Sequence, residues 1–496
     1  MTTPTQVDIS GWTVQASSPY LDGNYTSSTR PAGGGGSLEY DLPISPTAVW
    51  VSTTGNDTTG DGSQSTPYAT LRRAIDDVTG AGDEICIADG IYNIGDSGHA
   101  DWLINDHPTA NLGAIPSGNS WAASHTDRSN MFLIRAETPF GVRWNITGSP
   151  SYYENPVYLT SAQYVSIDGI IFNHESTFGE NTVDIGENNY MTRCGVKRNA
   201  INDYGGWIKV LSGSLAEMCF GSGGVRYGFR SGDATNAVSD VCFRLCVARQ
   251  DFSPNEQPQA AFLFYGNNSG NLATDAAFLN CIAVDGQGEG QVAIYGYTWG
   301  SFYGPKNSTN VELAGFISLN CTVYGGNAGI YGPEQSGTGY NLHDSVVWNL
   351  GDSGAGTSDG IRFDGSGTNT ATRMTIGNVP DAYESAYVST SSRLSDTLNG
   401  IQPSVLYQSD GADARYVFGS LGQRYGDAGY NVKSATPVFP YPYEDTIKSV
   451  MSETNTTPAG HYPDPNTAAR GFCLDTSLTN YIITYVNSGT VIGDIY

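Results

Sequence analysis

The sequence is short of basic residues and of long apolar runs. Lys and Arg together number 23 against 49 Asp and Glu, which leaves a formal net charge of -26 over 496 residues. Nucleic-acid binding needs clustered basic side chains that displace counterions from phosphates, so this balance argues against such a partner. No stretch reaches the roughly 18 apolar residues that a membrane-spanning helix needs. The composition therefore predicts neither a nucleic-acid partner nor a membrane span.

The beginning of the chain has no visible export signal. Residues 1–10 lack both the basic segment and the apolar segment of a Sec signal peptide. A virion protein released by lysis would need no such signal, and a chain trimmed of its signal would look the same. We therefore expect the protein on a virion surface or in the extracellular medium.

The 8 cysteines form no metal-binding pattern. Cys242 and Cys246 lie four residues apart without a second pair or a nearby His, which is not zinc-site spacing. Cys194, Cys281 and Cys321 sit in strand-like apolar surroundings. We interpret these cysteines mainly as small buried residues of a packed core.

The chain repeats a short sequence motif. A Gly-bearing apolar strand and a turn are followed by a second strand of the form apolar-x-Asn-Cys-x-Val or a variant of it. Copies occupy 261–286, 293–326 and, more loosely, 329–365. Cys281 and Cys321 lie 40 residues apart, and Ile330 and Ile361 lie 31 apart, spacings that suit one coil of a solenoid. The sequence therefore predicts an all-β chain that stacks on itself.

The first 78 residues divide into an arm and a cap. Residues 1–48 are polar and rich in Gly, Ser and Thr, so they cannot bury a core of their own. We expect them to form an arm that anchors the protein to capsid or tail proteins. Segment 66–78 places Leu71, Ile75 and Val78 at helical spacing after a Thr-Pro start, which predicts a short amphipathic helix. Such a helix would cover the open end of the first coil.

A series of short motifs carries a resemblance to a known superfamily. The motifs are Gly-Asn-Asp at 55–57, Pro-Tyr-Ala-Thr-Leu at 67–71, Ala-Ile at 74–75, Gly-Asp at 82–83 and Gly-Ile-Tyr at 90–92. This series resembles the opening of right-handed parallel β-helix proteins of the pectin-lyase-like superfamily, which includes polysaccharide lyases and phage tail spikes. Residues 162–173 are similar to the strand–turn–strand pattern of that superfamily. The resemblance covers about 49–370 and concerns the fold, because its motif residues build coils.

The resemblance implies a right-handed parallel β-helix solenoid with a short N-terminal capping helix and a small C-terminal cap. The predicted divisions are an arm at 1–48, the β-helix at 49–370, an irregular end of the solenoid at 371–438 and the cap at 439–496.

Two kinds of chemistry known on this fold need charged clusters. Lyases abstract a proton with Arg or Lys, often beside calcium, and Arg226 and Arg230 are candidates for that role. They belong to a set of basic residues that also contains Lys197, Arg198, Lys209, Arg244 and Arg249. Glycosidases use paired carboxylates. Candidates for such a pair are Asp285, Glu289, Glu334, Asp344 and Asp364. The alternative for both sets is ordinary surface charge on turns.

The segment 295–304 is dense in aromatic residues. They are Tyr295, Tyr297, Trp299, Phe302 and Tyr303. Their density and the interspersed glycines predict an excursion from the coil. A subunit interface, stacking on sugar rings and packing against the solenoid all remain open for it.

The acidic turn at 56–62 is the candidate metal site. Asp57 and Asp61 offer the oxygen ligands that calcium prefers, but the turn lacks the full EF-hand pattern. Asx-turn hydrogen bonding explains the same residues without a metal. The sequence thus requires no cofactor, with calcium as the ion to test.

The sequence decides the fold better than the activity. We predict a virion-associated structural protein, a spike, fibre or head-decoration protein, that presents a rigid surface and could bind host or environmental glycans. The alternatives are an extracellular polysaccharide lyase or glycoside hydrolase and a non-catalytic glycan-binding adhesin. The sequence favours a protein that is not an enzyme. We expect a homo-oligomer, with a trimer favoured.

Overall fold

The computed structural model describes most residues between 43 and 383. The described residues are 43–95, 99–106, 114–121, 129–138, 141–147, 155–175, 181–198, 206–217, 219–223, 227–232, 237–244, 246–250, 260–264, 273–279, 281–285, 300–304, 309–314, 316–319, 322–323, 328–335, 338–343, 346–348, 351–352, 359–365, 368–372, 375–377 and 381–383. Among them no helix is long and apolar enough to cross a membrane.

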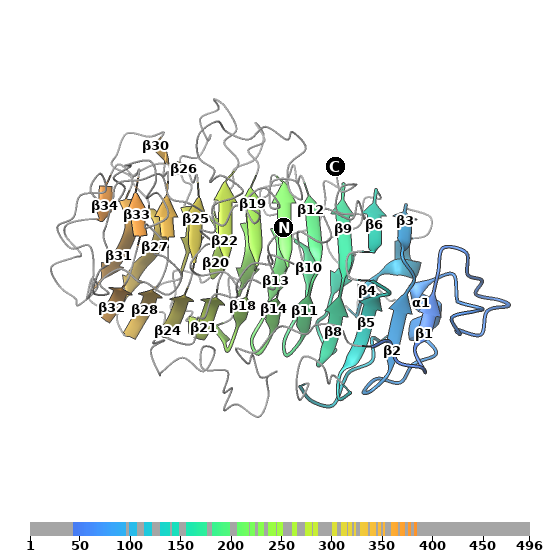
Figure 1. Cartoon of the computed structure of the whole chain (residues 1–496). Helices are drawn as coiled ribbons and strands as arrows, with labels where there is room; N and C mark the ends of the chain where they lie inside the picture. Colours follow the sequence, from blue (N-terminus) through green and yellow to red (C-terminus); the bar gives the residue numbers. More distant parts are fainter. Residues whose placement is uncertain are drawn as a thin grey trace, which may run out of the picture.

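Three long parallel sheets, named A, B and C, make up the described body (Figure 1). Sheet A contains β1 (Val49–Val51), β2 (Glu84–Ile87), β5 (Phe132–Ala136), β8 (Val165–Asp168), β11 (Tyr190–Thr192), β14 (Leu215–Glu217), β17 (Val238–Ser239), β18 (Cys242–Arg244), β21 (Ala273–Leu279), β24 (Thr309–Ala314), β28 (Thr338–His343) and β32 (Thr368–Thr372). Sheet B contains β3 (Gly90–Ile94), β6 (Val142–Ile146), β9 (Ile170–His174), β12 (Gly195–Arg198), β15 (Phe220–Gly223), β19 (Val247–Gln250), β22 (Ile282–Asp285), β25 (Ile317–Leu319), β29 (Val346–Trp348) and β33 (Thr375–Gly377). Sheet C contains β4 (Ile104–Asn105), β7 (Val157–Tyr158), β10 (Asn181–Asp184), β13 (Gly206–Val210), β16 (Tyr227–Ser231), β20 (Ala260–Phe264), β23 (Gly300–Tyr303), β27 (Ala328–Gln335), β31 (Asp359–Gly365) and β34 (Asp381–Tyr383). A small pair, β26 (Thr322–Val323) and β30 (Gly351–Asp352), lies beside them.

The chain visits the three sheets in turn. It passes from β8 in sheet A to β9 in sheet B and β10 in sheet C, and then returns to sheet A with β11. Each of these strands pairs in parallel with the strand one coil away, as β8 does with β11 and β9 with β12. The predicted parallel β-helix is confirmed. The last described strands are β33 and β34, within the segment predicted as the irregular end of the solenoid.

The corner between sheets A and B is tight. Gly169 alone joins β8 to β9 and has a φ of 81°, and Arg193 has a φ of 50° one coil later. The left-handed conformation turns the chain within one or two residues, and Gly adopts it without strain. Arg193 adopts the same conformation with a side chain attached, and that side chain is held by an ion pair described below.

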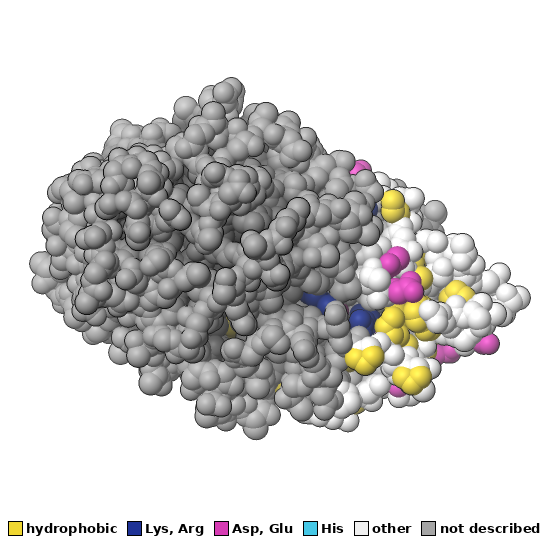
Figure 2. Space-filling view, viewed as in Figure 1, with side chains coloured by type: hydrophobic (Ala, Val, Ile, Leu, Met, Phe, Trp, Pro, Cys, Tyr) yellow, Lys and Arg dark blue, Asp and Glu magenta, His cyan; other side chains and the backbone are white. Residues whose placement is uncertain are grey.

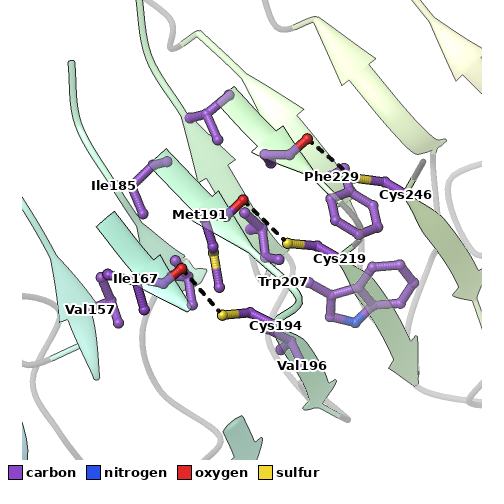
Figure 3. Packing of buried hydrophobic residues seen from close by; sticks show 14 of the residues in the cluster. Val157, Ile167, Ile185, Met191, Cys194, Val196, Trp207, Cys219, Phe229 and Cys246 are labelled. Atoms are coloured by element: carbon purple, nitrogen blue, oxygen red, sulfur yellow. Dashed lines mark hydrogen bonds between the residues drawn. The ribbon is translucent and has the colours of Figure 1, made fainter. Parts of the chain in front are cut away.

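A column of cysteines lines the core behind this corner. The register of sheet B aligns Cys194, Cys219, Cys246 and Cys281 in four successive coils, and all four are buried. Each thiol lies within 3.4–3.7 Å of a backbone carbonyl oxygen in the preceding coil. Figure 3 shows these contacts for Cys194, Cys219 and Cys246. The interpretation of these residues as small buried core residues is confirmed. Burial raises the pKa of the thiols of Cys194, Cys219 and Cys246.

The register corrects one of the two repeat spacings. Ile330 pairs directly with Ile361, so that spacing marks one coil. The Cys281 to Cys321 spacing does not mark a coil, because the position after Cys281 in its column is Phe316. Cys321 lies outside the described residues.

Aromatic side chains fill the core of the middle coils. Phe229 stacks on Phe262 with ring centroids 5.1 Å apart, and Phe243 stacks on Phe278 at 5.0 Å. Phe302 meets Phe278 edge to face at 5.2 Å. Offset and edge-to-face pairs of this kind stabilise a core beyond the area they bury.

The predicted capping helix is present but shorter. The helix α1 spans Leu71–Ile75, and Leu71, Ala74 and Ile75 are buried in the main core beside β1. It begins late because Tyr68 forms an isolated parallel bridge with Val51, which keeps the chain extended there. Thr70 then caps the helix by accepting a hydrogen bond from the backbone N–H of Arg73 at 3.3 Å. A 3-10 turn, η1 (His99–Trp102), contacts α1.

Candidate binding site on the outer face of sheet C

One column of residues runs along sheet C on the side away from the core. The register places one of its members in each successive coil, alternating along each strand with the core positions Val183, Ile208, Phe229, Phe262 and Phe302. The sheet C column consists of Tyr158, Asp184, Lys209, Arg230, Leu263, Tyr303, Tyr331 and Arg362. Neighbouring members are one strand spacing, about 4.8 Å, apart. Four of its members are buried: Leu263 completely, and Asp184, Lys209 and Arg230 with exposed fractions of 3%, 8% and 6%.

An ion pair joins two members of the sheet C column. The Lys209 ammonium nitrogen lies 2.9 Å from Asp184 Oδ2, and the two side chains are 11% and 5% exposed. Asp184 Oδ1 also accepts a hydrogen bond from the backbone N–H of Gly186 at 3.3 Å. A charge that is mostly withdrawn from solvent is screened by salt much less than an exposed one. The pair therefore fixes the Lys209 ammonium against Asp184.

Arg230 follows Lys209 one coil later. Its guanidinium carbon lies 5.7 Å from the centroid of the Tyr227 ring, a cation–π distance. Tyr227, Ala260 and Leu263 form a small apolar cluster on the same outer side. Three successive coils thus carry one carboxylate and two cations, against the strongly negative charge of the whole chain.

Aromatic positions continue the sheet C column. Tyr303 in β23 and Tyr331 in β27 pair directly, and Arg362 in β31 follows them. Aromatic and Arg residues are the types whose flat faces stack on sugar rings and on each other. The column therefore passes from a charged segment to an aromatic one.

The predicted basic set is divided among the three sheets. Lys197 and Arg198 lie on β12 and Arg249 on β19, both in sheet B, whereas Arg244 lies on β18 in sheet A. Of the described members, only Lys209 and Arg230 pair in register on neighbouring strands of sheet C. Arg226 lies outside the described residues. A single stripe that contains the whole basic set is therefore not formed.

The predicted carboxylates are also placed apart, with one exception. Asp285 ends β22 in sheet B, and Asp364 lies on β31 in sheet C, so these two are not neighbours. Glu334 lies on β27, where the pairing with β31 is irregular between Gly332 and Gln335. The paired part of β31 runs from Phe363 to Gly365. Glu334 and Asp364 are therefore on adjacent strands, close to Tyr331 and Arg362 of the sheet C column. Glu289 and Asp344 lie outside the described residues.

The aromatic segment is a strand where it is described. Gly300–Tyr303 forms β23, which pairs with β20 and β27, so this part is no excursion from the coil. Phe302 is fully buried and packs against Phe264 and Phe278. Of the three alternatives left open for this segment, packing describes Phe302, which lies in the core. Tyr295, Tyr297 and Trp299 lie outside the described residues, and Tyr303 joins the sheet C column.

The acidic turn at 56–62 uses its carboxylates in hydrogen bonds. Asp57 accepts from the backbone N–H groups of Ala69 and Thr70 at 2.7 and 3.1 Å and from the Thr70 hydroxyl at 2.8 Å. Asp61 accepts from the Thr66 hydroxyl and from the backbone N–H of Ser63. These hydrogen bonds lower the pKa of Asp61 to about 2. Across the part of the chain that the structure describes, no three His, Cys, Asp or Glu residues gather as a metal would require.

Sequence reasoning missed a second set of charges, on sheet A. Arg193 forms a two-point ion pair with Asp168, with Nε 2.7 Å from Oδ1, and both side chains are almost fully buried. The Tyr190 hydroxyl donates to Glu217 Oε2 at 2.6 Å. Arg193 follows Asp168 by 25 residues, as Lys209 follows Asp184. That shared offset of an acid and a base is the signal that could have found both pairs. Both buried pairs join side chains of neighbouring coils.

Comparisons with known proteins agree on the fold alone. No family model matches the chain, and no curated protein matches it significantly. A rhamnogalacturonan lyase structure is similar with a TM-score of 0.33 and 14% identity, over 66% of this chain and 74% of that one. A mannuronic acid specific polysaccharide family 6 lyase from human gut microbiota gives 0.29 and 11%, over 64% and 80%. The catalytic unit of a GH87 alpha-1,3-glucanase from Streptomyces thermodiastaticus gives 0.28 and 10%, over 71% and 68%.

The parallel pairing of strands in three stacked sheets defines a protein of the parallel β-helix class. Fold likeness at this distance says nothing of activity, which has to be argued from the site.

Proposed function

We propose that the protein binds a linear, acidic polysaccharide lengthwise along the sheet C column. The observation that carries the proposal is the register of Asp184, Lys209 and Arg230 in three successive coils. It sets two cations about 4.8 Å apart along the axis that an extended polymer would follow. The aromatic positions Tyr303 and Tyr331 continue the same line.

Charge favours an acidic ligand at this column in spite of the acidic chain. Lys209 and Arg230 have exposed fractions of 8% and 6%, so both are largely withdrawn from solvent and are held by Asp184 and Tyr227. Because the side chains are already held in place, binding would cost less side-chain entropy. Carboxylates of uronate sugars are the groups that a Lys and an Arg at adjacent positions would recognise. The Lys209 ammonium in its ion pair suits this binding role better than it suits proton abstraction.

The second candidate is cleavage of the bound glycan by hydrolysis. The observation that favours it is the placement of Glu334 and Asp364 on adjacent strands, beside Tyr331 and Arg362. Retaining glycosidases hold two carboxyl groups about 5–5.5 Å apart, close to the spacing between neighbouring strands. In this role one carboxylic acid would protonate the leaving oxygen while the other carboxylate attacks the sugar. Water, deprotonated by the first residue, would then displace the sugar from the second carboxylate.

The virion role stays a prediction. Its attachment arm, 1–48, lies outside the described residues except for 43–48. A glycan-binding sheet C column would serve a virion spike, an adhesin or a secreted enzyme equally well.

Binding to polygalacturonate, with neutral dextran as the comparison, tests the main proposal. Arg230→Gln should weaken binding of polygalacturonate by about tenfold or more, because a hydrogen bond to a charged group contributes about 1.5–3 kcal/mol. A double variant, Lys209→Met with Asp184→Asn, removes the second cation and also neutralises the carboxylate that pairs with it. Added salt should weaken binding of the unchanged protein.

Lys197→Met is the matched control, since Lys197 is a cation on sheet B. If this control loses as much affinity as Arg230→Gln, or if neither sheet C variant loses affinity, the proposal is wrong. The release of reducing ends from the same polysaccharides tests hydrolysis. Glu334→Gln and Asp364→Asn should each lower that rate by about a hundredfold, whereas Asp285→Asn should not.

A further inference from the structure

The three long sheets end differently at the first coil. In sheet A the chain itself closes the edge of β1, since the backbone N–H of Trp50 donates to Gly62 at 2.7 Å and that of Tyr68 donates to Trp50 at 2.9 Å. In sheet C the last strand at this end is β4, where Asn105 is fully buried. In sheet B the last strand is β3, and its edge is open.

Every second residue of β3 turns its backbone away from the neighbouring strand β6. The backbone N–H of Gly90 donates to the carbonyl oxygen of Gly141 at 2.9 Å, so Gly90 faces β6. The backbone groups of a strand alternate between its two edges, and this alternation points those of Ile91 and Asn93 outward. No described residue hydrogen-bonds to the backbone N–H or C=O of either one. Outward-facing N–H and C=O groups are therefore available along β3.

β3 also lacks the residues that protect an edge strand. Its sequence, Gly-Ile-Tyr-Asn-Ile, contains no charged residue and no Pro, which discourage pairing at an edge. The Ile91 side chain is 48% exposed, and it is the only large apolar side chain that is exposed in the described part of the chain. An apolar residue on an open edge favours the addition of another strand.

A ladder of amides ends at the same edge. Asn173 donates to Asn145 at 3.3 Å, and Asn145 donates to Asn93 Oδ1 at 3.0 Å. The Nδ2 group of Asn93 is the next donor, and no acceptor for it lies among the described residues. An amide oxygen one strand spacing beyond β3, about 4.8 Å away, would continue the ladder. The edge therefore selects Asn or Gln at the position opposite Asn93.

The geometry of the edge indicates what binds to it. Backbone N–H and C=O groups that recur at every second residue are matched by another extended polypeptide, as in strand addition to a sheet edge. The loop between β1 and α1 projects past β3 at this end of the solenoid, which keeps a second solenoid away but leaves room for a single strand (Figure 1). We propose that β3 binds an extended segment of a partner protein in parallel, with an apolar residue opposite Ile91 and Asn or Gln opposite Asn93.

Calorimetric titration of the full chain with a short peptide tests the proposal. The peptide acetyl-Thr-Ile-Thr-Asn-Thr-amide places Ile opposite Ile91 and Asn opposite Asn93. N-methylation of its central Thr removes the N–H that would donate to the carbonyl oxygen of Ile91, and should weaken binding by about tenfold or more. N-methylation of its Asn is the matched control, because that N–H points away from β3 in this register. A peptide with Leu in place of Asn should bind about two- to tenfold more weakly.

A pair of protein variants tests the same edge from the other side. Ile91→Lys adds the kind of charge that protects natural edge strands, and should weaken peptide binding by about tenfold or more. Thr59→Lys adds the same charge to an exposed position of the loop at this end, and should leave binding unchanged. Because both residues are exposed, thermal unfolding of the two variants should match that of the unchanged protein.

Hydrogen exchange at single residues separates this proposal from its rivals. The backbone amides of Ile91 and Asn93 should exchange fast in the free protein and slowly with the peptide bound. Slow exchange in the free protein would show that the same chain or a second copy already covers the edge, which would overturn the proposal. Equal losses for the two N-methylated peptides, equal losses for the two lysine variants, or no binding at about 1 mM peptide would also overturn it.

Discussion

The first and the later coils of this β-helix use the same backbone ladder with different side chains. In the first coils Asn145 donates to Asn93 at 3.0 Å and Asn173 donates to Asn145 at 3.3 Å, a ladder of amides that faces solvent in part. In the later coils the same column carries Val284, Leu319 and Trp348. The pairing of strands thus forms the solenoid in both regions, whereas the side chains on its outer side determine which molecules each region can contact.

The surface around the first coils is correspondingly mixed. Figure 2 shows the described surface at that end of the molecule, where acidic, basic and apolar side chains lie interspersed. Specific polar contacts hold this part together, as in the Asp168–Arg193 pair, whereas stacked phenylalanines hold the middle coils. The predictions below test the two kinds of support separately.

Removal of a central phenylalanine should have the largest effect in the middle coils. Phe278→Ala should lower the free energy of unfolding by about 3–5 kcal/mol, because it removes a ring packed on Phe243, Phe264 and Phe302 and leaves a cavity. Urea denaturation measures the change. Phe278→Leu, which refills part of the cavity, should recover a large share of it, and a loss below about 1 kcal/mol for Phe278→Ala would show that the stack does not support these coils.

Removal of a buried carboxylate should have a similar effect nearer the first coils. Asp168→Ala leaves the buried Arg193 guanidinium without its ion-pair partner, which should cost about 3–5 kcal/mol in the same denaturation experiment. The control is Asp76→Ala, because the Asp76 side chain is 63% exposed and its pair with Arg72 should contribute at most about 1 kcal/mol. Equal losses for the two variants would contradict a supporting role for the buried pair.

Thiol reactivity distinguishes the core from the rest of the chain. Cys86, Cys194, Cys219, Cys242, Cys246 and Cys281 are buried. Burial raises the pKa of Cys194, Cys219 and Cys246, so little thiolate is present at neutral pH. We expect Ellman's reagent to label at most Cys321 and Cys473 in the folded protein and all 8 thiols after unfolding. Fast labelling of Cys219 in the folded protein would show that the cysteine column is open to solvent.

The amide ladder should contribute little to stability. Asn145→Ala removes both of its hydrogen bonds to neighbouring amides and should cost about 0.5–1.5 kcal/mol, because these groups can bond to water instead. Asn145→Asp keeps the shape but places a carboxylate beside the acceptor oxygen of Asn93. A loss above about 3 kcal/mol for Asn145→Ala would show that the first coils depend on this ladder as the middle coils depend on their rings.

The smallest expected effect is that of low pH on Asp61 in the turn at 56–62. The Thr66 hydroxyl and the backbone N–H of Ser63 donate to Asp61, and they lower its pKa from 3.8 to about 2. A lowered pKa means that the stabilisation is complete above pH 3.8 and is lost as the pH falls through about 2. An NMR titration of Asp61 should show this midpoint, and Thr66→Val should raise it. An unchanged midpoint in that variant would remove Thr66 as the main cause.

The sequence was sufficient for the fold because the features that build coils are local. The recurring strand motifs predicted an all-β chain that stacks on itself, and the resemblance to the pectin-lyase-like superfamily implied the parallel β-helix. The capping helix was placed correctly, but its start was predicted too early, since the bridge between Tyr68 and Val51 joins residues distant in sequence.

The candidate site was less predictable because the coils differ in length. The cysteine column advances by 25, 27 and then 35 residues, as the positions of Cys194, Cys219, Cys246 and Cys281 show. Without the register, the basic residues of three sheets look like one set, and only the pairing of β13 with β16 brings Lys209 beside Arg230. The same lack of register made Phe302 look like a surface residue when it belongs to the core.

Hydrogen exchange with and without a galacturonate oligosaccharide tests the central claim most directly. Binding along the sheet C column should slow exchange in peptides that contain β13, β16, β23 and β27, while peptides from β12 and β18 keep their rates. Protection confined to sheets A or B, or no protection at a ligand concentration that saturates binding, would contradict a glycan-binding role for the sheet C column.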